Sequence, residues 1–165
     1  MFDSPNIVFW DDLQQQYQLF ARGWLPNPPE LHSDFTRGGG GYRTIRRTVS
    51  RDFVNWSDFQ EIDMGDSQPE HLYTNAATPY FRAPHIYMGF PKRFVPERTS
   101  AIDRTVNETG VSDGVFMTSR DQIHFHRFVK DFVRPGLDQK NWMQRSNMAA
   151  WGMLQTSPEE ISMYY

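Results

Sequence analysis

Short apolar and aromatic segments alternate with turn residues along the whole chain. Each segment is bounded by Gly, Pro, Asn, Asp or Ser, which is typical of strands joined by tight turns. The expected strands are 6–10, 17–21, 42–49, 72–77, 85–90, 114–119, 150–156 and 161–165. Short helices are expected only at 68–71 and 139–145. With 13 Phe, 7 Tyr and 5 Trp beside 11 Gly and 11 Pro, the composition also favours pleated sheets, so we predict an all-β fold.

A turn motif occurs twice. Ser50-Arg51-Asp52 returns 69 residues later as Ser119-Arg120-Asp121, and each copy continues with three residues and an aromatic ring. A Ser or Asp side chain that bonds nearby backbone, followed by a ring that covers the sheet end, suits a corner between two strands. The alternative is two unrelated hairpin turns that share three letters.

A repeat of this size, containing about four short strands, is typical of one blade of a β-propeller. Closed propellers carry at least about four blades, whereas this chain has room for about two and a half. The expected parts are a blade over 1–66, a blade over 67–137 and the start of a third over 146–165. We therefore expect either a fragment of a longer chain, completed by the remaining blades, or a chain that assembles with a partner or with itself.

Charge and composition exclude several functions. The chain carries 17 Lys and Arg against 20 Asp and Glu, so no global basic field favours a nucleic acid or an anionic membrane. The absence of Cys excludes disulfides, thiolate zinc sites and a Cys nucleophile. No apolar run approaches the roughly 20 residues of a spanning helix, and the start shows no signal-peptide pattern. We expect a soluble protein, and the compartment stays open.

Cofactor and metal motifs are weak. The glycines at 38–41 lack the Lys-Ser/Thr of a phosphate loop and the spacing of a dinucleotide site, so we expect a flexible loop there. His124 and His126 form the closest histidine pair and lack a third ligand nearby. Arginines over 43–51 lie near Asp52 and Asp58, which predicts local pairing. We expect no cofactor and no metal.

Polar and aromatic residues gather around the expected strand at 72–77. Aromatic faces and hydrogen-bond donors together suit sugars, whose C–H faces stack while their hydroxyls bond. The alternative is an ordinary exposed sheet edge. The candidate substrate contacts are Tyr73, Asn75, Arg82 and His85, with Tyr87 beside them. Asp113, in Ser-Asp-Gly, is predicted to be a turn residue.

The segment from Ser50 to Trp56, followed by Ser57, resembles the blade signature of the five-bladed propeller glycosidases of families 32, 43 and 68. Asp3-Ser4-Pro5-Asn6 and the segments 7–10 and 17–20 are similar to the opening, inner strand and second strand of those enzymes. The runs HLYTNAATPYFRAPHIYMGFPKRF and GVSDGVFMTSRD also resemble bacterial proteins described only as related to family 32 hydrolases.

This resemblance implies glycoside hydrolysis by two carboxyl groups that face a central funnel. It implies that Asp3 is the nucleophile, base or stabilising carboxylate; the alternative is a turn cap before Pro5. It places Glu70 near the family's proton donor, although no Pro follows, and a surface Glu is the alternative. Where the family has Asp-Pro, this chain has Asn75 and Thr78-Pro79, and neither Asn75 nor Thr78 can carry the proton transfer.

Three functions stay open. The first is a glycosidase-like propeller that acts on carbohydrate through its funnel, with Asp3 and Glu70 as catalytic residues. The second is a non-catalytic carbohydrate-binding propeller, which the neutral Asn75 and Thr78 favour. The third is a structural or protein-interaction propeller whose aromatic rim binds a partner.

Overall fold

The computed structural model describes residues 6–26, 41–73, 75–98, 110–134, 136 and 147–165. All regular structure in these ranges is β-strand, which confirms the all-β prediction. The helix expected at 68–71 is wrong: Gln68, Pro69 and Glu70 have no regular secondary structure and His71 begins a strand. Tertiary contacts decide this segment, because Arg127 binds both the Gln68 carbonyl and the Glu70 carboxylate. The helix expected at 139–145 lies outside the described residues.

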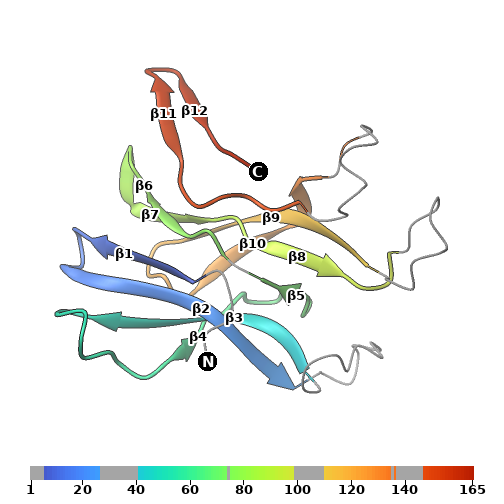
Figure 1. Ribbon diagram of the computed structural model, residues 1–165, viewed down its shortest axis with the longest axis horizontal. Helices are drawn as coiled ribbons and strands as arrows, with labels where there is room; N and C mark the ends of the chain where they lie inside the picture. The colour runs from blue at the N-terminus through green and yellow to red at the C-terminus, as the bar shows by residue number, and fades with distance from the viewer. Residues whose placement is uncertain (1–5, 27–40, 74, 99–109, 135, 137–146) are drawn as a thin grey trace.

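The first sheet is a four-stranded antiparallel meander in the order β1-β2-β3-β4 (Figure 1). One face carries alternating apolar residues such as Ile7, Phe20 and Ile45, each less than 10% exposed. The strands are β1 (Ile7–Asp11), β2 (Gln16–Pro26), β3 (Gly41–Ser50) and β4 (Gln60–Glu61). β2 runs further than its apolar pattern predicts because it pairs with β3 continuously from Tyr17 to Pro26.

The second sheet has six strands in the order β5-β8-β9-β7-β6, with β10 also paired to β9. β8 and β7 pair with successive parts of β9. The strands are β5 (His71–Leu72), β6 (Thr78–Tyr80), β7 (Ala83–Gly89), β8 (Lys92–Val95), β9 (Val111–Ser119) and β10 (Phe125–Val133). The strand expected over 72–77 ends at Leu72, because Asn75 Oδ1 accepts the Ala77 amide and Ala76 has a positive φ of 42°.

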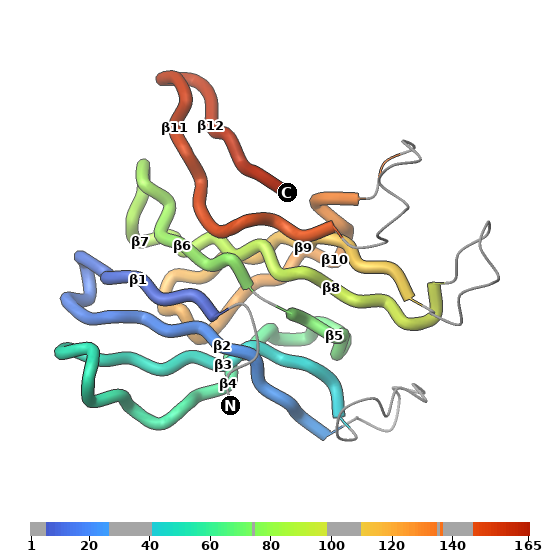
Figure 2. The backbone as a smooth tube through the Cα atoms, viewed as in Figure 1, coloured from blue at the N-terminus to red at the C-terminus, as the bar shows by residue number. Residues whose placement is uncertain are grey.

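A two-stranded hairpin follows, formed by β11 (Leu154–Ser157) and β12 (Glu160–Ser162). Both strands are shorter than the apolar pattern predicts. Figure 2 shows the hairpin beyond the β6–β7 end of the second sheet. Arg82 Nη2 donates to the Pro158 carbonyl at 2.6 Å, which ties the hairpin to that end.

The core lies between the facing sides of the first two sheets. Phe20 stacks on Phe9 and meets Phe125 edge-on, with ring centroids 6.3 Å apart in both pairs. At one end of this interface, Asp11 is 1% exposed and accepts hydrogen bonds from Tyr87 Oη and Gln122 Nε2. The interface therefore combines an apolar centre with a buried carboxylate that joins both sheets.

The two copies of the repeated motif form the same turn. Ser50 Oγ accepts the Phe53 amide at 2.9 Å, and Ser119 Oγ accepts the Gln122 amide at 2.8 Å. Phe53 and Gln122 are equivalent positions and have positive φ angles of 65° and 68°. In both copies the Asp carboxylate also accepts two backbone amides. The side-chain-to-backbone turn expected from the sequence is confirmed.

Candidate functional site

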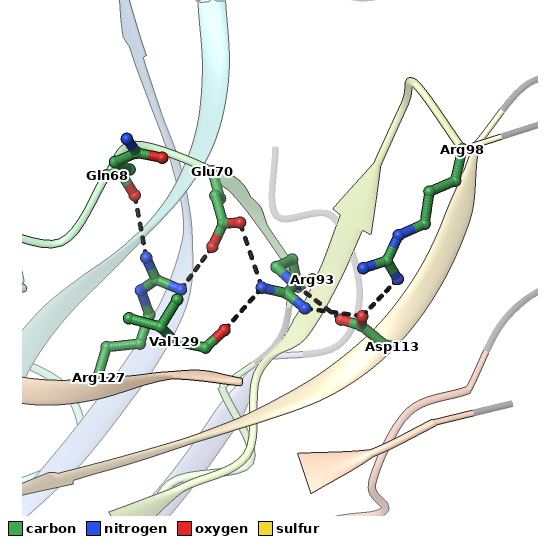
Figure 3. Close-up of polar contacts among 7 residues, drawn as sticks. All are labelled: Gln68, Glu70, Arg93, Arg98, Asp113, Arg127 and Val129. Atoms are coloured by element: carbon green, nitrogen blue, oxygen red, sulfur yellow. Dashed lines mark hydrogen bonds and ion pairs between the residues drawn. The ribbon is translucent and has the colours of Figure 1, made fainter. Parts of the chain in front are cut away.

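Glu70, the expected proton donor, lies just before β5 and is held by two arginines (Figure 3). Its Oε1 accepts from Arg93 Nη1 at 3.2 Å, and its Oε2 accepts from Arg127 Nη1 at 2.5 Å. The side chain is 30% exposed, so it is partly open to solvent. Each carboxylate oxygen therefore already binds a guanidinium group. Asp3, the other expected catalytic residue, lies outside the described residues, and both catalytic roles stay predictions.

Asp113 lies at the centre of the same network. The sequence did not indicate that it is an ion-pair partner. Arg93 Nε and Nη2 donate to its two oxygens at 2.8 Å each, and Arg98 Nη1 donates to Oδ2 at 2.8 Å (Figure 3). The Asp113 side chain is fully buried, and its hydrogen bonds raise the pKa of Arg93. The turn prediction is wrong because Asp113 stands in β9 directly opposite Arg93 of β8. The Asp-Gly pair could not reveal that register.

Tyr73 and Asn75 stand together in the segment between β5 and β6. The Tyr73 ring meets Phe94 edge-on at 6.4 Å, and cationic side chains lie around it. Asn75 is 2% exposed, and its backbone carbonyl accepts the Phe90 amide at 2.6 Å. Its Nδ2 has no hydrogen-bond partner among the described residues. Asn75 thus shapes the turn into β6 and keeps one free donor.

Arg82 and His85 stand at the opposite end of β6. Both are exposed, and Arg82 lies over the Phe81 ring while its Nη2 binds the Pro158 carbonyl. Tyr87, by contrast, is 1% exposed and donates to Asp11. The structure therefore brings Tyr73 and Asn75 together and separates them from Arg82 and His85, because β6 stands between the two pairs.

A groove of about 360 Å³ lies where three segments meet, each of which leads to an edge strand of a different sheet: β1, β6 or β11. Its lining is mostly apolar, with one exposed ring, Trp151, at 53%. Trp151 Nε1 donates to the Ala77 carbonyl at 2.9 Å, which fixes the orientation of the indole. The lining residues are 6–8 before and within β1, Ala76 before β6, and 148–151 before β11.

The arginines of β3 do not pair as the sequence suggested. No ion pair among the described residues joins residues 43–51 to Asp52 or Asp58. Instead Arg46 lies over the Phe59 ring at 4.1 Å, and Arg47 Nε donates to Gln18. Asp52 is occupied by the turn itself. Packing on rings and turn formation thus replace the expected local pairing.

The described residues contain no group of three or more His, Asp or Glu side chains placed to hold a metal ion. Within the same part of the chain, no helix is long and apolar enough to cross a membrane.

Comparison with known proteins finds one relevant likeness. No protein-family model matches the sequence, and no curated protein matches it significantly. Among solved structures, the chain is similar to an N-acetylgalactosamine deacetylase from F. plautii, determined in complex with blood group B trisaccharide. The TM-score is 0.51 at 13% identity, and the match covers 79% of this chain but 31% of the other. At this identity, the comparison shows that the chain is similar in fold to part of a carbohydrate-active enzyme.

Proposed function

We propose that this chain is the carbohydrate-binding part of a propeller domain and that the groove at Trp151 binds the saccharide. The observation that carries the proposal is the convergence of three segments, each leading to an edge strand of its sheet, on one groove with an exposed indole. In a propeller, the innermost strands surround the central funnel. The parts 1–66, 67–137 and 146–165 are then successive blades.

Two further features support this function. Apolar pockets with one aromatic face and a few fixed polar groups suit a sugar ring, which stacks through its C–H face and bonds through its hydroxyls. Trp151 supplies the face, and Asn6 adds a polar side chain to the lining. The fold is also shared with part of a protein that was crystallised with a trisaccharide.

A glycan array followed by isothermal titration calorimetry tests the proposal. We expect Trp151→Ala to weaken binding of a saccharide found on the array by about tenfold, which corresponds to about 1.4 kcal/mol. Trp151→Phe, which keeps a ring but loses the bond to Ala77, should retain most of the affinity. Trp10→Ala is the matched control, since Trp10 is an exposed Trp of β1 outside the groove lining. Equal affinity in all four proteins would overturn the assignment of the groove.

Glycoside hydrolysis is the second candidate. It is favoured by the position of Asp3, which precedes the groove residue Asn6 by three residues. Turnover of aryl glycosides by the protein, lost in both Asp3→Asn and Glu70→Gln at unchanged melting temperature, would establish it. Binding without turnover leaves the first function, and neither signal favours a protein-interaction propeller.

The proposed blades also predict assembly with further blades or with a second copy. Light scattering combined with thermal unfolding measures this. A stable, cooperatively folding monomer of the 165 residues alone would contradict it.

A further inference from the structure

Three cationic side chains from three strands surround Tyr73. Arg22 of β2, Arg43 of β3 and Lys92 of β8 form what we call the cationic cluster. Their charged groups lie 5.4, 4.5 and 5.3 Å from the centroid of the Tyr73 ring, within the range of cation–π attraction. β2 and β3 belong to the first sheet and β8 to the second, so tertiary packing alone gathers these charges.

The cluster has an aromatic wall that is open to solvent. Trp24 is 41% exposed, and Arg43 lies 4.8 Å from the centroid of its ring. The two residues face one another across the β2–β3 ladder. Arg22, Arg43, Tyr73 and Lys92 are all half-buried, so each side chain is partly dehydrated and partly exposed to solvent.

The positive charges of the cluster repel one another. Burial, and then the nearby Arg43 charge, lower the pKa of Lys92 and of Arg22. The same two causes lower the pKa of His71, although the Glu97 carboxylate acts in the other direction. His71 Nδ1 accepts the Arg43 backbone amide at 3.2 Å, which fits a neutral imidazole. Positive charge is therefore concentrated at this place.

Arg43 differs from the arginines of the Glu70 network. Arg93 and Arg127 each donate to a carboxylate. Arg43 Nε and Nη1 are buried, and neither has a hydrogen-bond partner among the described residues. A buried guanidinium nitrogen without an acceptor is costly, so an acceptor supplied by a ligand would be stabilised there.

We propose that Arg43 and Lys92, with Arg22 beside them, bind one oxyanion of an acidic saccharide, either a carboxylate or a sulfate, next to Trp24 and Tyr73. A guanidinium presents a fork of donors that suits a carboxylate or sulfate, and an ammonium adds a point charge. The net charge of −3 does not oppose this, because charges beyond about 8 Å are largely screened at physiological salt. This inference rests on the proposed carbohydrate function and adds the class of saccharide.

Calorimetry with matched probes tests the cationic cluster. The probes are a galacturonic acid trisaccharide, a sulfated galactose trisaccharide, the neutral galactose trisaccharide and sodium sulfate alone. At about 50 mM NaCl we expect at least one acidic trisaccharide to bind about tenfold more tightly than the neutral one, and the advantage to shrink at about 500 mM. Which acidic probe benefits distinguishes carboxylate from sulfate recognition.

The variant Arg43→Gln with Lys92→Gln should abolish this advantage and leave the affinity for the neutral trisaccharide unchanged. Arg46→Gln is the matched control, since Arg46 lies on the same strand and packs on Phe59 instead. If the double variant does not fold, Lys92→Gln alone should reduce the advantage several-fold. The inference is overturned if these variants still bind an acidic trisaccharide more tightly than the neutral one. It is also overturned if the unaltered protein binds all three trisaccharides with equal affinity.

The same data separate this inference from the proposed function. If neutral and acidic trisaccharides bind equally well, the carbohydrate function stands and the oxyanion site fails. If no saccharide binds but sulfate does, and the double variant loses it, the carbohydrate function fails and the oxyanion site stands. If sulfate does not bind either, both are overturned.

Discussion

Arg93 binds both carboxylate oxygens of the fully buried Asp113, with two N–H···O distances of 2.8 Å. The same guanidinium donates to Glu70 and to the Val129 carbonyl. One side chain of β8 thereby joins β9, β10 and the segment before β5. Bidentate pairing in a dry site also orients each partner, so this network sets the position of Glu70.

We expect Asp113→Asn to lower the free energy of unfolding by about 3–5 kcal/mol, because the buried Arg93 loses its buried, bidentate carboxylate and keeps only the partly exposed Glu70 as an ion-pair partner. Urea unfolding measures this. Glu70→Gln is the isosteric comparison and should cost less, since its side chain is 30% exposed and Arg127 keeps the Gln68 carbonyl. If both variants lose the same free energy of unfolding, Asp113 is not the central partner of this network.

The buried Asp11 predicts a second effect. Tyr87 Oη donates to Asp11 Oδ2 at 2.6 Å, and burial together with this bond raises the pKa of Tyr87. Tyr87→Phe should cost about 1–3 kcal/mol, because a buried carboxylate loses a donor. Tyr17→Phe serves as control, since the Tyr17 ring packs edge-on against Trp10 and Phe53 at a half-buried position. Chemical denaturation that finds the two variants equally stable would exclude this role.

The stability contributed by the second copy of the turn should depend on pH. A hydrogen bond and the charge of Asp121 raise the pKa of His124 above its ordinary value of about 6.5. A raised pKa in the folded state gives a stabilisation that is complete below about pH 6.5 and is lost as the pH rises through the folded pKa. NMR titration of the imidazole should show the raised pKa, and Asp121→Asn should bring it down.

His124→Asn is the matched variant for this pH effect. Asn55 holds the equivalent position in the first copy and donates to Asp52 at 2.7 Å. The variant should keep the turn. Its free energy of unfolding should no longer change with pH between the unfolded-state and folded-state pKa values of His124. A stability profile that is the same for both proteins across this window would contradict the pairing.

Two glycines with positive φ should differ in their tolerance of a side chain. A Cβ on Gly65, at φ 58°, meets nothing within 4 Å, so Gly65→Ala should cost only the strain of about 1–2 kcal/mol. A Cβ on Gly110, at φ 99°, would lie 2.3 Å from the Phe94 ring. Gly110→Ala should therefore cost about 2–5 kcal/mol in thermal unfolding, since overpacking adds to strain. A smaller loss at Gly110 than at Gly65 would refute this packing.

Local chemistry explains why much of the fold was predictable. The Ser-x-Asp turns form from hydrogen bonds within a few residues, so a short motif is sufficient to specify them. Short apolar segments bounded by turn residues likewise predicted β1, β3, β7 and β9 close to their positions. The segment at 72–77 departs from its pattern because one side chain, Asn75, bonds the Ala77 amide and ends pairing.

The sequence by itself determined an all-β chain, its repeated turns and the absence of thiol chemistry, because these depend on residue type and near neighbours. Only the tertiary structure decided that Asp113 pairs with Arg93, that Asp11 is buried against Tyr87, and that Arg43 and Lys92 meet at Tyr73. These contacts join residues far apart in the chain. Strand register and sheet packing set them, and a one-residue shift would turn each side chain to the other face.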